Sequence, residues 1–188
     1  MKLGIKEFFE GKTILLTGTT GFVGKVVLEK ILRSLPGFKK LFVMVRAKKN
    51  MTPLERFERA VLSSEIFALL RQDRAAFEAL KAKMVPINGD LIIDKLGMSD
   101  ADRAMVTAEC EIVINVAASV NFDDPILDAL EINYFGCKRM LQLAKECRNI
   151  LTFTHVSTAY VNSNNPDGSK IEEKIYDLPS GQDPEELV

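Results

Sequence analysis

The sequence predicts an α/β fold: a doubly wound parallel sheet that is truncated after about its fifth strand. Short apolar runs alternate with segments of helical spacing from Thr13 to Ser157. A glycine-rich stretch follows the first apolar run, and small or polar residues follow the later ones. Regular alternation of strand and helix produces a parallel sheet with right-handed crossovers and helices on both faces. Such sheets bind ligands beyond the carboxyl ends of their strands, where these residues fall.

Five apolar runs are the expected strands. The run at 41–45 is apolar throughout, which is typical of a strand buried on both faces. The expected strands are residues 13–17, 41–45, 84–88, 111–116 and 150–157. The expected helices are residues 22–35, 53 to about 83, 99–108 and 125–148.

Local signals mark the helix ends. Pro36-Gly37 ends the first helix. Thr52-Pro53 is an N-cap followed by a first-turn proline, and we expect that helical region to break near Ser63-Ser64. Ser99 caps the third helix. One side of the first helix is expected to carry Val23, Val26, Val27, Lys30, Ile31 and Leu35.

Composition narrows the function. The 188 residues include 25 Lys and Arg against 26 Asp and Glu, so the basic excess of a phosphate-contacting nucleic-acid binder is missing. Three cysteines without a C-x-x-C pair, and a single histidine, argue against a disulfide framework and a structural zinc site. No window approaches 18 consecutive apolar residues. We therefore expect no nucleic acid, no metal and no membrane span in this chain.

A glycine-rich turn, Thr17-Gly-Thr-Thr-Gly-Phe-Val-Gly, follows the first expected strand and opens the first expected helix. Gly18 permits the tight turn, Gly21 lets the backbone approach a diphosphate, and Gly24 lets the helix pack close to the sheet. The helix N-terminus offers free N–H groups to phosphate. The alternative is a glycine-rich turn without a ligand, but the context of strand, turn and helix favours a dinucleotide. The expected contacts are Gly18, Thr20, Gly21, Phe22, Val23 and Gly24.

The end of the second strand indicates which dinucleotide. NAD sites place Asp or Glu there to hold the ribose 2′-hydroxyl, whereas this strand ends in Arg46. Arginine can bind a 2′-phosphate through two hydrogen bonds, so we predict NADP(H). Arg56 is a weaker second candidate. The sequence therefore predicts an incomplete, Rossmann-type NADP(H)-binding domain at residues 1–161, followed by a polar loop and tail at 162–188.

The remaining strand ends supply further candidates. Asp90 could accept a hydrogen bond from the adenine amino group, with Leu91 beside it, although Asn-Gly-Asp is also an ordinary turn. The small residues Ala117, Ala118 and Ser119 would let the cofactor lie against the backbone. After the fifth strand, Ser157 and Thr158 could hold a substrate carbonyl oxygen. His155 is expected to be a packed strand residue rather than a catalyst.

Together these residues resemble the extended short-chain dehydrogenase/reductase superfamily and, within it, the N-terminal part of the fatty acyl-CoA reductases related to male-sterility proteins. The resemblance covers about residues 5–162. The phrase His-Val-Ser-Thr-Ala-Tyr at 155–160 is specific to that family, whereas the glycine turn is specific only to the superfamily. The segments that carry the resemblance are residues 8–12, 17–24, 43–46, 89–90, 115–122, 133–136 and 155–160.

The resemblance implies NADPH-dependent reduction of a long-chain acyl-CoA to a fatty alcohol. By motif position, Thr158 would polarise the carbonyl with Ser157 beside it, and Asn133 would lie near the nicotinamide side of the cofactor. The superfamily also needs the Tyr of a Tyr-x-x-x-Lys pair on the helix after the fifth strand. Tyr134 and Lys138 have that spacing but precede the fifth strand. We therefore expect an N-terminal fragment that is inactive by itself.

Other functions fit parts of the same pattern. A thioester reductase acting on carrier-bound acyl groups, or another extended short-chain reductase, would share the cofactor half. A non-catalytic nucleotide-binding module is an alternative of a different class. A sugar-nucleotide epimerase is disfavoured, because Arg46 argues against NAD. By resemblance alone, we expect a cytosol-facing protein whose parent is attached to the peroxisome or the endoplasmic reticulum.

Overall fold

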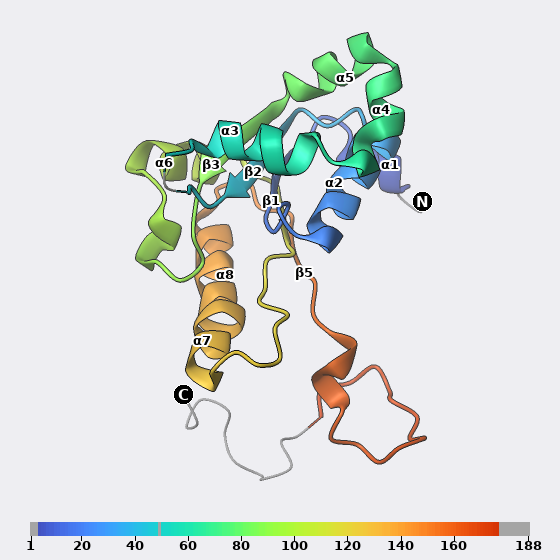
Figure 1. Cartoon of the computed structure of the whole chain (residues 1–188), viewed down its shortest axis with the longest axis vertical. Coiled ribbons are helices and arrows are strands. Elements are labelled where there is room, and N and C mark those ends of the chain that lie inside the picture. Colours follow the sequence, from blue (N-terminus) through green and yellow to red (C-terminus); the bar gives the residue numbers. More distant parts are fainter. Residues whose placement is uncertain (1–3, 49, 177–188) are drawn as a thin grey trace. The chain divides into compact units, whose positions relative to one another are not determined.

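The described part of the chain, residues 4–48 and 50–176 of a computed structural model, contains one parallel sheet (Figure 1). Within these residues five strands pair in the order β3-β2-β1-β4-β5, and every pairing is parallel. The strands are β1 (Thr13–Leu16), β2 (Lys40–Val45), β3 (Met84–Asn88), β4 (Ile112–Asn115) and β5 (Thr152–His155). They confirm the five expected strands and the α/β class.

The strand order places a topological switch point beside β1. The chain runs outward from β1 to β2 and β3, then crosses back to place β4 and β5 on the other side of β1. Leu16 pairs with Val43 of β2 and with Ile114 of β4, so the carboxyl ends of the three strands meet at one edge. Connections that leave in opposite directions open a crevice at such an edge.

Alternate residues of the strands face two separate hydrophobic clusters. On β1, Ile14 and Leu16 belong to one cluster and Leu15 to the other, because successive side chains of a strand point to opposite faces. The first cluster includes side chains of α2 (Phe22–Ser34), and the second includes side chains of α8 (Gly136–Glu146). Helices therefore cover both faces of the sheet, which confirms the doubly wound arrangement.

The segment between β2 and β3 is helical but broken. Thr52 begins it with a capping box: its hydroxyl accepts from the Glu55 N–H at 3.2 Å, and the Glu55 carboxylate accepts from the Thr52 N–H at 2.8 Å. The interruption at Ser63-Ser64 is confirmed. The parts are α3 (Pro53–Phe57), the π-helical η1 (Glu58–Leu62), the 3₁₀ helix η2 (Glu65–Phe67), α4 (Ala68–Gln72) and α5 (Arg74–Lys81).

Two helical regions flank β4. Ser99 caps the helix before β4 by accepting from the Asp102 N–H at 3.0 Å, as predicted. The region after β4 contains a stretch of π geometry in its middle. The elements of this half are η3 (Asp94–Gly97), α6 (Asp100–Glu109), α7 (Ile126–Leu130), η4 (Glu131–Phe135) and α8, and α1 (Ile5–Phe9) precedes β1.

The buried side of α2 differs from the predicted one. Gly24, Leu28, Ile31 and Leu32 are its buried residues, so Ile31 is the one member of the expected stripe that is fully buried. Val23 and Val26 are exposed, and Lys30 is exposed as well. Gly24 sets the rotation of α2 about its axis. Because it has no side chain, its backbone can lie against the Gly18 turn, and the residues one and two helical turns later then face the same buried side. Val27 and Leu35 pack only partly against the cluster.

Residues from Ser157 onward belong to a second unit. Thr158 caps η5 (Ala159–Asn162), and its hydroxyl oxygen accepts from the Tyr160 N–H at 3.2 Å. Residues 163–176 contain turns and bends without a helix or strand, and the end of the expected tail, 177–188, lies outside the described residues. No helix in the described part of the chain is long and apolar enough to cross a membrane.

Candidate functional site

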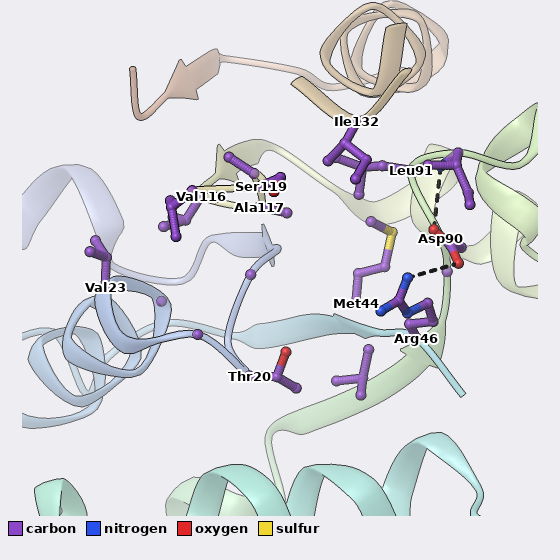
Figure 2. Close-up of a pocket in the computed structure, with 18 of the residues that line it drawn as sticks. Thr20, Val23, Met44, Arg46, Asp90, Leu91, Val116, Ala117, Ser119 and Ile132 are labelled. Carbon is purple, nitrogen blue, oxygen red and sulfur yellow. Dashed lines mark hydrogen bonds and ion pairs between the residues drawn. The ribbon is translucent and has the colours of Figure 1, made fainter. Parts of the chain in front are cut away.

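A crevice opens at the carboxyl ends of β1 to β4 (Figure 2). Its volume of about 520 Å³ falls within the range of about 300–1,000 Å³ typical of small-molecule sites. All but one of the residues expected to hold a cofactor line it, and the exception is Asn133. The lining residues that were predicted are Gly18, Thr20, Gly21, Phe22, Val23, Gly24, Arg46, Asp90, Leu91, Ala117, Ala118 and Ser119.

The crevice also has walls that sequence reasoning missed. Most are apolar or small neighbours of predicted residues, whose types carry no binding signal of their own. They are Met44, Val45, Gly89, Ile92, Val116, Val120 and Ile132. Ile132 comes from η4 and directly precedes Asn133, so the 133–136 segment of the resemblance was the only available hint of it. Arg56, the weaker candidate, lines the crevice too.

The glycine-rich turn is packed against its surroundings at two points. Gly18 has a φ of +75°, and a Cβ there would lie 2.7 Å from the Ala117 backbone nitrogen. A Cβ on Gly24 would lie 2.1 Å from the Gly18 carbonyl oxygen. Gly18 therefore serves the tight turn as predicted, and Gly24 lets α2 pack against that turn itself. No β-carbon fits at either position, so the first turn of α2 is held at the edge of β1.

The N-terminus of α2 faces the crevice without a capping side chain. Its N-cap, Gly21, makes no side-chain hydrogen bond, and its first turn contains no acidic residue. The first N–H groups of a helix have no intrahelical acceptor and carry partial positive charge. The N-terminus of this 13-residue helix, which no side chain caps, can therefore bind an anion.

Two guanidinium groups and one carboxylate meet beyond β2 and β3. Arg46 Nη1 lies 3.6 Å from Oδ2 of Asp90, and the Arg46 side chain is 60% exposed. A dashed line marks this ion pair in Figure 2. Arg56, from α3, donates to the backbone carbonyl of Arg46. Burial, and then the charge of Arg46, lowers the pKa of the Arg56 guanidinium. Because the two guanidinium groups repel each other and only one carboxylate faces them, an additional anion bound beside Arg46 and Arg56 would be stabilised.

The loop after β4 is held by side-chain to backbone hydrogen bonds. The Ser119 N–H donates to Asn133 Oδ1 at 2.8 Å, and Asn133 Nδ2 donates to the Ser119 carbonyl at 3.1 Å. The Ser119 hydroxyl donates to Asp124 at 2.5 Å. Asn133 therefore acts on the crevice through Ser119 instead of forming part of its wall.

The remaining candidates lie elsewhere. Tyr134 and Lys138 are on the helical region between β4 and β5, where the sequence placed them, and Lys138 Nζ donates to the Tyr134 hydroxyl at 3.4 Å. Ser157 and Thr158 begin the second unit, and their catalytic part stays a prediction. Among residues 4–48 and 50–176, no cluster of three or more His, Cys, Asp or Glu side chains could hold a metal ion.

Comparison with known proteins relates this crevice to a family. Residues 16–187 match a family of NAD-binding domains described as male sterility protein. Fatty acyl-CoA reductase 1 of Mus musculus is 39% identical over 186 residues, which cover 99% of this chain and 34% of that protein. Probable fatty acyl-CoA reductase 5 of Arabidopsis thaliana is 42% identical over 170 residues, or 88% of this chain and 34% of the relative. The chain thus spans about a third of the length of these curated relatives.

Solved structures agree on the architecture. The terminal R domain of the myxalamid PKS-NRPS biosynthetic pathway superposes with a TM-score of 0.70 at 31% identity, covering 92% of this chain and 41% of that one. A reductase domain of a Mycobacterium tuberculosis non-ribosomal peptide synthetase gives 0.63 at 27% identity, covering 82% and 35%. Since the matched family is NAD-binding, the cofactor of this domain is a nicotinamide dinucleotide. The chain therefore belongs to the male sterility protein family, and it is similar to the fatty acyl-CoA reductases.

Proposed function

We propose that this chain is the NADP(H)-binding part of an oxidoreductase that reduces long-chain acyl-CoA to fatty alcohol, a reaction of lipid metabolism. The observation that carries the proposal is the crevice itself. It combines a glycine-rich turn, an uncapped helix N-terminus and two arginines at the switch point of a parallel sheet. The 39% identity to fatty acyl-CoA reductase 1 of Mus musculus supports acyl-CoA as the substrate.

Arg46 and Arg56 support NADP(H) over NAD(H). A guanidinium forms paired hydrogen bonds with a phosphate. Here Arg46 pairs with Asp90, and Arg56 donates to the backbone carbonyl of Arg46, so one carboxylate faces two cations. Asp90 would compete for Arg46 with the 2′-phosphate of the nucleotide. An ion pair 60% exposed on its arginine side contributes little, so a phosphate dianion can replace it. Asp90 would then be available to accept a hydrogen bond from the adenine amino group.

The rest of the crevice suits the middle of the dinucleotide. The diphosphate would lie at the N-terminus of α2, beside Thr20, Gly21 and Phe22. Ala117 and Ala118 carry methyl side chains, which allow a flat ligand to approach the backbone. Asn133 would orient the nicotinamide side by holding Ser119 in place.

Two reductive steps follow from the resemblance. When bound, the cofactor would supply hydride: one NADPH would reduce the thioester to an aldehyde as CoA leaves, and a second NADPH, together with a proton, would reduce the aldehyde to an alcohol. The hydroxyl of Thr158, with Ser157 beside it, would donate a hydrogen bond to the carbonyl oxygen as negative charge develops there. The Tyr134 and Lys138 pair lies on the helical region before β5 and is assigned no role as proton donor. We therefore expect the 188 residues to bind NADP(H) at best weakly and not to turn over an acyl-CoA.

A titration of the 188-residue chain with NADPH and with NADH tests the cofactor assignment. We expect NADPH to bind at least ten-fold more tightly, since a hydrogen bond to a charged group contributes about 1.5–3 kcal/mol. Arg46→Glu should abolish that preference. Arg74→Glu, the same change at an exposed position of α5 outside the crevice, should leave it unchanged. Equal affinity for the two nucleotides would refute the assignment.

A second candidate function is a thioester reductase acting on carrier-bound acyl groups. It is favoured by the 31% identity and TM-score of 0.70 to the terminal R domain of the myxalamid pathway. NADPH oxidation by the whole protein, with acyl-CoA and with a carrier-bound acyl group compared directly, distinguishes the two. Failure to oxidise NADPH with either thioester would favour a non-catalytic nucleotide-binding module.

For location, we infer a cytosol-facing protein attached at the peroxisome or the endoplasmic reticulum. The support for this is the resemblance to fatty acyl-CoA reductases alone. A fluorescent fusion of the whole protein, imaged beside markers of the two organelles, tests it, and uniform cytosolic fluorescence would contradict it.

A further inference from the structure

Three polar side chains form a hydrogen-bonded chain across the carboxyl ends of β1, β4 and β5. The Thr17 hydroxyl lies 2.7 Å from Asn115 Oδ1, and Asn115 Nδ2 lies 3.2 Å from Nδ1 of His155. Thr17 and Asn115 are both completely buried, whereas His155 is exposed. The register places Asn115 directly beside His155.

Counting donors and acceptors shows which group donates in each hydrogen bond of this hydrogen-bonded chain. The Thr17 oxygen already accepts two hydrogen bonds, from the backbone N–H groups of Val116 and Ala117, each at 3.1 Å. Its single proton must therefore be donated to the Asn115 side chain, which has to present its carbonyl oxygen. The amide nitrogen of Asn115 is left to face His155. Nδ1 of His155 can complete the contact only as an acceptor, so the imidazole proton belongs on Nε2.

Thr17 connects this hydrogen-bonded chain to the crevice. The Ala117 N–H that Thr17 holds belongs to the crevice wall, and so does Val116. If Asn115 turned its amide around, two N–H donors would face the proton of the Thr17 hydroxyl, and a completely buried pair would lose its bond. His155, at the exposed end of the hydrogen-bonded chain, opposes that rotation because its Nδ1 accepts from the Asn115 amide nitrogen.

We propose that His155, in its neutral Nε2–H form, is a positioning residue: by accepting from Asn115, it orients Thr17 and thereby the Val116–Ala117 backbone beside the bound nucleotide. His155 is not among the residues that line the crevice, and it is exposed where a packed strand residue was expected. The hydrogen-bonded chain stands on the geometry alone, whereas its effect on nucleotide affinity rests on the proposed function.

The tautomer can be measured directly, because His155 is the only histidine of the 188 residues. Long-range ¹H–¹⁵N NMR of the chain labelled at histidine, with any purification tag removed, distinguishes a protonated from a bare Nδ1. At about pH 8.5, where imidazoles are neutral, we expect a bare Nδ1 in the presence and absence of NADPH. A protonated Nδ1 would overturn the inference, whatever the chain binds.

Two matched variants test the effect on the crevice. His155→Asn keeps an acceptor at the position of Nδ1, whereas His155→Leu has a similar shape and no acceptor. We expect His155→Leu to weaken NADPH binding about three- to ten-fold, and His155→Asn to restore most of the affinity. Equal affinities of the two variants would overturn the positioning role. A wild-type chain that fails to bind NADPH would overturn that role together with the proposed function, and the tautomer would still decide the hydrogen-bonded chain.

Discussion

Replacing Gly24 with alanine places a methyl group against backbone. The added Cβ would lie 2.1 Å from the Gly18 carbonyl oxygen, more than 1 Å closer than an ordinary contact, and 2.8 Å from the Thr19 nitrogen. Overpacking of this kind costs about 1–3 kcal/mol, and more where backbone has to move. Alanine returns about 1 kcal/mol through its better helix propensity. Because the added methyl meets backbone, the cost falls in the upper part of that range, about 2–3 kcal/mol, and we expect Gly24→Ala to lower the free energy of unfolding by about 1–2 kcal/mol.

Gly37→Ala is the matched control. Its Cβ would lie 1.9 Å from a carboxylate oxygen of Glu10, a nominally worse overlap, but that atom is the end of a flexible side chain that can rotate away. Urea unfolding followed by circular dichroism compares the two variants. With a slope of about 2 kcal/mol per molar urea, Gly24→Ala should lower the midpoint by about 0.5–1 M, and Gly37→Ala should hardly shift it. A midpoint for Gly24→Ala at or above the wild-type value would refute the packing argument.

Three other variants test separate parts of the structure. Arg56→Ala should weaken NADPH binding about ten-fold and leave NADH binding nearly unchanged, and calorimetric titration with both nucleotides would expose a loss common to the two. Burial raises the pKa of Glu111, but hydrogen bonds from Lys12 and from the Thr13 N–H outweigh it, so the pKa lies below its ordinary value of 4.5. The stabilisation by Glu111 is therefore present above that value and is lost as pH falls through the lowered pKa. Glu111→Gln should flatten the acid limb of unfolding free energy against pH, and an unchanged limb would contradict this. Met140→Ala, at a completely buried position of α8, should cost about 2–5 kcal/mol in urea unfolding, and a loss below 1 kcal/mol would mean that the site collapses around the smaller side chain.

Much of the fold could be predicted because the signals are local. A continuous apolar run such as Leu41–Val45 has few conformations that bury it on both faces, and it forms most of β2. The buried side of α2 could not be predicted from spacing. The stripe that begins at Val23 and the one that begins at Gly24 differ by a single residue, and the close approach to Gly18 decided between them.

The candidate site shows the same division. The glycine-rich turn and Arg46 were recognisable because each occupies a defined place after a strand. The attachment of Asn133 to Ser119 was not, since it joins a helix to a loop through a backbone contact that depends on how the two elements pack. The residues predicted at the strand ends therefore line the crevice, whereas walls supplied by neighbouring elements, such as Ile132, were not predicted.

By itself, the order of residues determined which segments become strands, where helices begin and which residues follow the strand ends, because steric preference, capping and periodicity operate within a few residues. Tertiary structure alone decided that Thr17, Asn115 and His155 form one hydrogen-bonded chain. These residues lie 98 and 40 positions apart in succession, and only the strand order β1-β4-β5 and its register bring them together. The donor and acceptor roles of Thr17 and Asn115 then followed from burial, since polar groups completely removed from water must satisfy one another, and the role of His155 followed from its contact with Asn115.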